Sequence, residues 1–259
     1  PEICEALEAK GITHPFPIQA LTLPVALEGQ DIIGQAKTGT GKTLGFGIPL
    51  LMDTLGPGEE GWDEDPASGS PQALVILPTR ELAKQVAEEL STAAAKRTVR
   101  IVQVYGGRAY EPQIEDLERG AEVVVGTPGR LIDLMERGVL DLAHVTTVVL
   151  DEADEMLDLG FLPDVEKILA RTRADRHTML FSATMPGAVV ALARRYMTRP
   201  THIRAQDPGD EGMTVQTVQQ VVYRTHSMNK VEVVSRILQA EGRGRTIIFA
   251  RTKRTAARV

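Results

Sequence analysis

The sequence predicts an α/β fold in which a doubly wound parallel sheet is covered by helices on both faces. Short runs of Val, Ile and Leu alternate with longer helical stretches along most of the chain. These short runs are apolar at most positions, without a regular polar–apolar alternation, which is typical of strands buried on both faces of a parallel sheet. Because parallel strands are joined by right-handed crossovers, repeated strand–helix units of this kind build one sheet, here of about seven strands.

The predicted strands and helices alternate along most of the chain, and no helix is predicted between residues 104 and 122. The predicted strands are residues 31–35, 73–77, 100–104, 122–125, 146–150 and 178–181. The predicted helices between and after them are residues 43–55, 80–95, 130–137, 162–170 and 187–197. A further helix is expected at the start of the chain, where Cys4 is a small apolar residue between Ile3 and Leu7.

Two segments interrupt this alternation and divide the chain. Residues 56–71 are acidic and rich in Gly, Pro and Ser, which indicates a surface loop, either a solvated connector or a partner-binding insertion. Residues 205–212 indicate a linker. The predicted domains are residues 1–204 and 213–259, and the second contains a strand at 218–223, a helix at 230–240 and a strand at 246–249. Since about 47 residues are too few for an α/β domain, we expect a second domain that begins here and is cut short.

Net charge, apolar runs and cysteine content exclude several classes of protein. The formal net charge is −6, so bulk charge does not indicate a nucleic-acid partner, and any such site has to be local. No apolar run reaches the roughly 18 residues of a membrane helix, and the N-terminus lacks a signal pattern. A single cysteine excludes an internal disulfide. The sequence therefore predicts a cytoplasmic protein without a membrane segment.

A phosphate-binding loop is predicted between the first strand and the helix that follows it. The segment is Ala36, Lys37, Thr38, Gly39, Thr40, Gly41, Lys42 and Thr43. Its glycines let backbone N–H groups turn toward phosphate oxygens, and the helix N-terminus adds the positive end of its dipole. Lys42 can reach the β- and γ-phosphates of ATP, and the Thr43 hydroxyl can ligate Mg²⁺. The segment departs from the GxxxxGK[ST] pattern only at Ala36, which stands in the first glycine position.

An acidic segment follows the strand predicted at 146–150. Asp151 and Glu152 stand at the carboxyl end of that strand, the edge where the phosphate-binding loop also lies in this architecture. Asp151 can hold Mg²⁺ through its water shell, and Glu152 can polarise an attacking water. Lys42, Asp151 and Glu152 therefore form the predicted catalytic set, with Thr43 and Asp151 as the predicted Mg²⁺ residues.

With these residues in place, the chain resembles the DEAD-box RNA helicases, whose name residues 151–154 spell. Further segments are similar to motifs of that family and follow its order. They are GITHPFPIQ at 11–19, PTRELA at 78–83, GG at 106–107, TPGR at 127–130, SAT at 182–184 and IIFART at 247–252. The resemblance spans the chain nearly end to end. It implies a RecA-like P-loop NTPase domain followed by the start of a second domain.

The resemblance also implies further site residues. For ATP it implies Ile12, Pro17 and Gln19, and Gln19 would hydrogen-bond the adenine edge with both its carbonyl and its amide. It implies that Asp154 pairs with Ser182 and Thr184 and so couples hydrolysis to strand separation. For RNA it implies contacts directed mainly at the backbone. These come from Pro78, Thr79, Arg80, Gly106, Gly107, Thr127, Pro128, Gly129 and Arg130.

Some of these positions have other interpretations. Arg80 and Arg130 have an alternative structural role as braces of their loops. Ile12 stands where the family usually has an aromatic residue, and the family's adenine-stacking aromatic further upstream is expected to precede this chain. The basic residues between 243 and 258 form either an RNA-binding surface or ordinary surface. The five histidines are scattered and do not predict a structural metal site.

The resemblance implies the core of an ATP-dependent RNA helicase, which uses ATP binding and hydrolysis to bind RNA and unwind duplexes locally. The family's arginine fingers lie in the remainder of the second domain. We therefore expect this chain to bind nucleotide but to hydrolyse it slowly. Two alternatives stay open. One is a nucleotide-switched RNA clamp whose output is partner binding, and the other is a different P-loop class such as a GTPase or small-molecule kinase.

Overall fold

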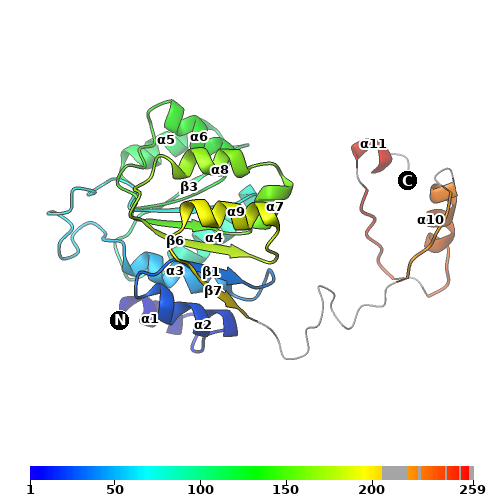
Figure 1. Ribbon diagram of the computed structural model, residues 1–259, viewed down its shortest axis with the longest axis horizontal. Helices are drawn as coiled ribbons and strands as arrows, with labels where there is room; N and C mark the ends of the chain where they lie inside the picture. The colour runs from blue at the N-terminus through cyan, green and yellow to red at the C-terminus, as the bar shows by residue number, and fades with distance from the viewer. Residues whose placement is uncertain (206–220, 227–228, 243, 251, 257–259) are drawn as a thin grey trace. The chain divides into compact units, whose positions relative to one another are not determined.

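The computed structural model describes residues 1–205, 221–226, 229–242, 244–250 and 252–256. The chain divides into two compact units, Pro1–Pro208 and Gly209–Val259. The first unit contains a seven-stranded sheet flanked by helices (Figure 1). None of the helices in the described ranges combines the length and the hydropathy that crossing a bilayer requires.

The sheet confirms the predicted fold class. Its strands run in the order β3-β4-β2-β5-β6-β1-β7, and every neighbouring pair is parallel. The strands are β1 (Ile32–Gln35), β2 (Ala73–Ile76), β3 (Ile101–Val104), β4 (Val123–Gly126), β5 (Thr147–Leu150), β6 (His177–Ser182) and β7 (Thr201–Arg204). The first six lie within one residue of the predicted bounds at either end.

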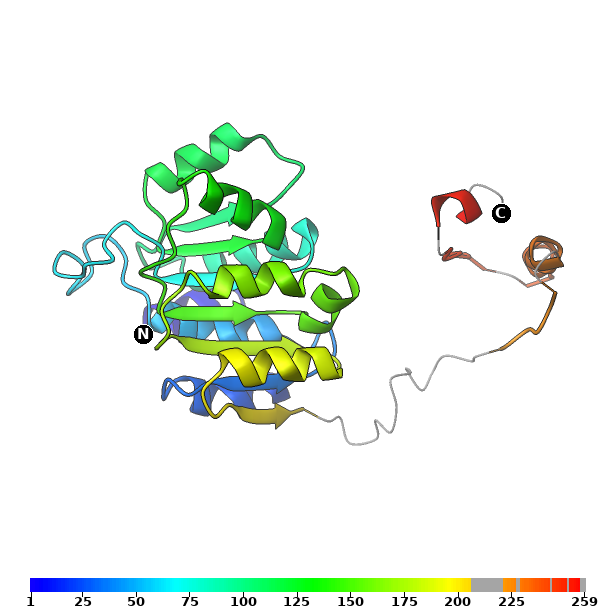
Figure 2. The ribbon, with the colours of Figure 1, turned by 45° about the horizontal axis from the view of Figure 1, so that its top comes forward.

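The helices form one layer on each face of the sheet (Figures 1 and 2). One layer holds α1 (Glu2–Glu8), α2 (Pro17–Ala26), α3 (Lys42–Met52) and α4 (Arg80–Ala93). The other holds α5 (Tyr110–Glu118), α6 (Pro128–Glu136), α7 (Ala153–Asp158), α8 (Leu162–Leu169) and α9 (Gly187–Tyr196). Helices on both faces are what a doubly wound sheet requires.

Alternate residues of the central strands supply the two hydrophobic cores. In β5, Val149 points to the α1–α4 layer, whereas Val148 and Leu150 point to the α5–α9 layer. In β6, Met179 and Phe181 face the first layer and Leu180 the second. Because both faces are covered, all of these side chains are buried, which explains why the central strands are rich in apolar residues on both faces.

Local chemistry helps to place two helices, α3 and α4, that lie in the same layer. The hydroxyl of Thr79 caps α4 by accepting from the N–H of Leu82 at 3.4 Å. Along α4, Ala83, Val86, Ala87 and Leu90 form one buried face. A side chain at Gly47 of α3 would collide with Leu90, since an added Cβ would lie 2.5 Å from its methyl carbon. Glycine at this position therefore lets α3 and α4 approach each other closely.

The second unit differs in part from the prediction. The predicted helix is present as α10 (Lys230–Leu238), and α11 (Lys253–Ala256) follows. Residues 246–249 were predicted as a strand, but they are described without one, and Ile247 and Phe249 are 79% and 93% exposed. A strand needs a hydrogen-bonded neighbour, and no strand is present among the described residues of this unit.

Other predicted segments of this region lie partly or wholly outside the described residues. Of the strand predicted at 218–223, residues 221–223 are not in a strand, and 218–220 lie outside the described residues. The predicted linker lies outside them as well, apart from Ala205. The loop predicted at 56–71 contains neither helix nor strand, and Arg97 anchors it by donating from Nε to the Glu59 carboxylate at 3.0 Å.

Candidate active site

The strands β1, β6 and β5 are neighbours, and each ends in a segment predicted to be functional. The phosphate-binding loop follows β1, Ser182 and Thr184 follow or end β6, and Asp151 follows β5. The backbone N–H of Ala36 donates to the carbonyl oxygen of Ser182 at 3.2 Å, which joins two of these segments. Since all three strands are parallel, their carboxyl ends place the three segments at one edge of the sheet.

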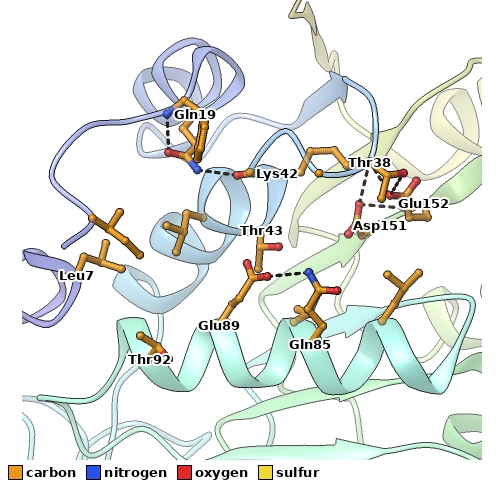
Figure 3. A pocket seen from close by; sticks show the side chains of 17 residues that line it. Leu7, Gln19, Thr38, Lys42, Thr43, Gln85, Glu89, Thr92, Asp151 and Glu152 are labelled. Carbon is orange, nitrogen blue, oxygen red and sulfur yellow. Dashed lines mark hydrogen bonds and ion pairs between the residues drawn. The ribbon is translucent and has the colours of Figure 1, made fainter. Parts of the chain in front are cut away.

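The predicted catalytic residues meet at this edge, as Figure 3 shows for Lys42, Asp151 and Glu152. The Lys42 ammonium donates to Glu152 Oε1 at 2.8 Å and lies 3.9 Å from Asp151 Oδ1. Thr38 Oγ1 donates to the same Glu152 oxygen at 3.0 Å. All three ionisable side chains are largely buried, so the ammonium compensates two acidic side chains that have little contact with solvent.

The backbone at Glu152 adopts an unusual conformation. Glu152 precedes α7 with φ 54° and ψ 50°, which is the left-handed region that residues with a side chain seldom occupy. Such a conformation costs about 1 kcal/mol or more and is found preferentially at functional sites. Here it accompanies the contact between the Glu152 carboxylate and Lys42.

Burial controls the protonation of Asp151. Burial raises the pKa of the Asp151 carboxyl to about 7. The Lys42 ammonium acts in the opposite direction, whereas the carboxylates of Glu152 and, more weakly, Glu89 raise the pKa further. A cation placed beside Asp151 would favour its ionised form, so the site is suited to binding positive charge.

A second cluster joins the start of α2 to the phosphate-binding loop. Gln19 Oε1 accepts from the backbone N–H of Phe16 at 2.9 Å, and Gln19 Nε2 donates to the carbonyl oxygen of Gly41 at 2.7 Å. Gly41 has φ 80°, and an added Cβ would lie 2.6 Å from the Phe16 ring and 2.7 Å from Gln19 Nε2. Glycine is therefore required at 41 both for its backbone conformation and for this close approach.

A pocket of about 370 Å³ connects the two clusters. Several predicted ATP-binding and catalytic residues line it. They are Ile12, Gln19, Thr38, Gly39, Gly41, Lys42, Thr43, Asp151 and Glu152. Three other predicted residues, Pro17, Ala36 and Thr40, do not line the pocket. Pro17 is the exposed first residue of α2, and Ala36 is buried just after the end of β1. The Thr40 hydroxyl donates to the Lys37 carbonyl oxygen at 2.7 Å.

Sequence reasoning missed one wall of this pocket. Leu82, Gln85, Val86 and Glu89 of α4 line it, together with Leu7 and Phe16. In Figure 3, Gln85 and Glu89 point from α4 toward Thr43 and Asp151, and Gln85 Nε2 donates to Glu89 Oε1 at 3.0 Å. Residues 82, 85, 86 and 89 have the spacing of one face of a helix. This spacing was the signal in the sequence that could have placed them together.

The predicted coupling residues form a compact network. Asp154 Oδ2 accepts from the backbone N–H of Thr184 at 2.9 Å and from its hydroxyl at 2.7 Å. The backbone N–H of Asp154 donates to Ser182 Oγ at 3.1 Å, and Ser182 Oγ donates to the Thr184 carbonyl oxygen at 2.7 Å. Burial raises the pKa of Asp154, but the hydrogen bonds from Thr184 and Ser182 outweigh it and hold the pKa below its ordinary value.

The residues predicted to contact RNA gather around a separate groove of about 450 Å³. The groove is lined by Pro78, Arg80, Gly106, Thr127, Gly129 and Arg130 from the predicted set, and by Tyr110, Asp133 and Phe161 in addition. Among the predicted residues outside the lining, Thr79 caps α4 and Pro128 is the buried first residue of α6. Gly107 has φ 77° and lies beside the Arg80 guanidinium.

The two arginines of this groove have different environments. Arg80 is 59% exposed and pairs with Glu81. Arg130 is buried, donates from both terminal nitrogens to the Arg108 carbonyl oxygen at 3.1 Å, and stacks on the Tyr110 ring at 3.8 Å. The geometry of Arg130 thus fits the role of a brace, and Arg80 is the arginine whose guanidinium lies in solvent.

Known proteins provide an independent comparison. The model of the DEAD/DEAH box helicase family matches residues 16–192. A DEAD-box ATP-dependent RNA helicase CshA from Geobacillus kaustophilus is 44% identical over 98% of this chain and 51% of its own length. Its counterpart in Bacillus subtilis is 41% identical over 98% of this chain and 49% of its own length. The chain therefore spans about half the length of the curated relatives that it matches.

Solved structures agree with the sequence relatives. The crystal structure of a DEAD box protein from Methanococcus jannaschii superimposes with a TM-score of 0.73 and 37% identity, covering 93% of this chain and 62% of that one. A hypothetical ATP-dependent RNA helicase from Sulfolobus tokodaii gives a TM-score of 0.69 and 36% identity, covering 79% of this chain and 56% of that one. The family model alone covers more than half of the sequence, and the chain belongs to the DEAD/DEAH box helicase family.

Proposed function

We propose that this chain is the ATP-binding core of an ATP-dependent RNA helicase that couples ATP hydrolysis to local unwinding of RNA duplexes. The observation that carries the proposal is the meeting of Lys42, Asp151 and Glu152 in the pocket at the carboxyl edge of the sheet. This arrangement provides a cation for phosphate and two carboxylates for a metal ion and a water. The relatives named as ATP-dependent RNA helicases support the choice of reaction.

The pocket fits ATP with Mg²⁺. Backbone N–H groups at the start of α3 and the Lys42 ammonium suit phosphate oxygens. No group of three or more acidic, histidine or cysteine side chains in the described part of the chain could hold a metal ion by itself. Mg²⁺ is commonly bound through one or two protein ligands together with substrate phosphates and water, so Thr43 and Asp151 would suffice. When bound, the ion would neutralise charge that develops on the phosphates.

Each residue of the pocket would then have a separate role in ATP hydrolysis. Lys42, which pairs with Glu152 in the structure, would turn to the β- and γ-phosphates and release the Glu152 carboxylate. Glu152 would orient and polarise the attacking water. Gln85 and Glu89 would line the outer wall beside Thr43. Since phosphoryl transfer depends mainly on positioning and charge, no covalent intermediate on the protein is required.

Contact with RNA would be made at the groove that Arg80, Gly106, Thr127 and Gly129 line. Backbone N–H groups, hydroxyls and one exposed arginine suit the phosphates and sugars of RNA and read little sequence. The network of Asp154, Ser182 and Thr184 joins the ends of β5 and β6 and would couple ATP hydrolysis there to strand separation. Residues 1–204 would form the nucleotide-binding domain, 205–212 a linker, and 213–259 the start of a second domain.

Nucleotide binding to this chain tests the first half of the proposal. Calorimetric titration with ATP, ADP, AMP and GTP in the presence of Mg²⁺ should show binding that prefers adenine and is lost in Lys42→Ala. Equal affinity for ATP and GTP would instead favour another P-loop class. RNA-stimulated ATP hydrolysis by the complete protein tests the second half, and RNA binding without any hydrolysis would favour a nucleotide-switched clamp.

A further inference from the structure

Glu89 places a third carboxylate in the nucleotide pocket. It lies on α4 four residues after Gln85, whose Nε2 donates to Glu89 Oε1 at 3.0 Å. Side chains four positions apart on a helix are neighbours on its surface, so this contact arises within α4 itself. In Figure 3 both side chains point from α4 toward Thr43 and Asp151. The hydrogen bond therefore holds the Glu89 carboxylate on the pocket side of the helix.

The packing of α4 fixes which of its residues face the pocket. Val86 and Leu90 belong to the buried face of the helix. Glu89 lies beside that face and lines the pocket, where it is half-buried. Glu88 is about 100° away around the helix and is exposed outside the pocket. Two glutamates that are adjacent in the sequence therefore have different surroundings.

The charges that line the pocket are unfavourable for phosphate groups that arrive alone. Three acidic residues line it, Glu89, Asp151 and Glu152, against one basic residue, Lys42. Burial raises the pKa of Asp151 to about 7, but even with Asp151 protonated two carboxylates face one ammonium. A nucleotide adds several negative charges, and like charges repel strongly in a partly desolvated site. The pocket therefore favours a nucleotide that brings positive charge with it.

Glu89 is the carboxylate of the pocket that the chain does not compensate. Asp151 and Glu152 lie 3.9 Å and 2.8 Å from the Lys42 ammonium. Glu89 has no ion pair in the described part of the chain, and its hydrogen-bond partner Gln85 is neutral. Its charge still acts on the catalytic residues, because it contributes to the raised pKa of Asp151. Glu89 is thus available to the cation that Thr43 and Asp151 would hold.

The position of Glu89 suits an indirect contact with that cation. Among the residues that the structure describes, no three acidic, histidine or cysteine side chains converge closely enough to ligate one ion. Mg²⁺ usually keeps several of its waters, and outer carboxylates accept hydrogen bonds from such waters. A hydrated cation would therefore meet an acceptor at Glu89, whereas a bare phosphate would meet a like charge.

We propose that Glu89 is a specificity-determining residue that makes the pocket select nucleotide accompanied by Mg²⁺ over metal-free nucleotide. The inference rests on the proposed function and adds to it a residue of α4 that acts through its charge. Repulsion of the phosphates lowers the affinity for the metal-free form, and contact with the water shell of the ion raises the affinity for the metal-bound form. An uncompensated like charge that rejects the wrong ligand is a recurrent source of specificity.

Calorimetric titration of this chain with ADP, once with saturating Mg²⁺ and once with EDTA, tests the assignment. In Glu89→Gln, binding of ADP should weaken about threefold with Mg²⁺ and strengthen about threefold in EDTA, because a half-buried charge is partly screened by solvent. The ratio of the two affinities should therefore fall roughly tenfold. Glu88→Gln is the matched control, since it removes the same charge one residue away and outside the pocket. It should leave both affinities like those of the wild type.

The opposite signs in the two media separate this role from a structural one. Glu89→Gln keeps the size of the side chain and an oxygen that can accept from Gln85, so the unfolding midpoint should be unaltered. Glu89→Ala is a second variant, and it should shift the ratio of the affinities in the same direction. An equal loss of ADP affinity in both media would mean that Glu89 only supports the wall, and unchanged affinities would mean that it does not face the phosphates.

Either of these two results overturns the inference about Glu89. If the wild type still binds ADP with Mg²⁺ and loses this binding in Lys42→Ala, the proposed function stands without it. No binding of ADP by the wild type in the presence of Mg²⁺ would overturn the inference together with the proposed function.

Discussion

The side-chain amide nitrogen of Gln19 lies 2.7 Å from the carbonyl oxygen of Gly41, so the residue expected to read adenine also supports the phosphate-binding loop. Gly41 is the residue before α3 and adopts the left-handed conformation. A side chain that holds it in place affects the direction of the N–H groups at the start of that helix. The side chain expected to recognise the base therefore also holds the loop that is expected to bind phosphate.

Removing this side chain should weaken binding of phosphate groups as well as of the base. In Gln19→Ala the Gly41 carbonyl loses its partner, and a hydrogen bond of this kind contributes about 0.5–1.5 kcal/mol. Tripolyphosphate affinity, measured by calorimetry, should fall roughly two- to tenfold, and the preference for ADP over GDP should disappear. Gln30→Ala, which removes an exposed glutamine, should change neither. Unchanged affinity for tripolyphosphate would show that the loop does not need Gln19.

A second prediction concerns the buried charges at Lys42. In Lys42→Met, the carboxylates of Asp151 and Glu152 lose their buried counter-charge, and breaking such a pair costs about 3–5 kcal/mol. Denaturant unfolding should therefore show a large loss of stability, and Glu152→Gln in the same chain should restore part of it. Lys96→Met is the control, because Lys96 pairs with Glu5 on the surface and should leave stability nearly unchanged. Additive effects of Lys42→Met and Glu152→Gln would contradict the pairing seen here.

A third prediction concerns the network that joins α7 to the end of β6. Asp154 and Thr184 share two hydrogen bonds, so the changes Asp154→Ala and Thr184→Val remove one common interaction. Their combined effect on the free energy of unfolding should be smaller than the sum of the single effects by about 1 kcal/mol. Thr172→Val supplies the comparison, since the Thr172 hydroxyl donates to Leu169 instead, and its effect should add to that of Asp154→Ala.

The order of motifs and the apolar strands made much of the fold predictable. The runs that became β2, β4 and β5 are buried at all positions, and their sequence reflects this. The strand β7 was missed because it lies at an edge of the sheet, where Thr201 and Arg204 are exposed and no apolar run is required. Residues 246–249 are the opposite case. Their apolar composition predicted a strand, but they are not in one, because a strand needs a hydrogen-bonded neighbour to form.

The charged end of the site was more predictable than its walls. Lys42, Asp151 and Glu152 follow directly from two short motifs. Phe16 and Glu89 reach the pocket only because α2 and α4 pack beside α3, and that packing is a tertiary relationship. The environment of Arg130 could not be predicted from the sequence either. In the structure its guanidinium is buried against a backbone carbonyl oxygen and a tyrosine ring. A sequence motif does not distinguish such an arginine from one that is exposed and free to contact RNA.

The last prediction separates the two arginines of the groove by the salt dependence of RNA binding. A side chain that neutralises a phosphate releases about one counterion, so its loss lowers the slope of log affinity against log salt by about one. Arg80→Ala should produce this change with an unaltered unfolding midpoint, because Arg80 is exposed and its ion pair among the described residues is with its neighbour Glu81. Arg173→Ala, which removes an exposed arginine outside the groove, should leave the slope unchanged.

Arg130→Ala should behave in the opposite way. It removes two hydrogen bonds to the Arg108 carbonyl oxygen and a cation–π contact with Tyr110, which together contribute about 2 kcal/mol to stability. The unfolding midpoint should fall, and RNA affinity should fall only as far as the groove loosens, with the salt slope of the wild type retained. If Arg130→Ala lowers the slope by one and leaves stability intact, the guanidinium leaves Arg108 to bind a phosphate, and Arg130 has to be assigned to RNA contact beside Arg80.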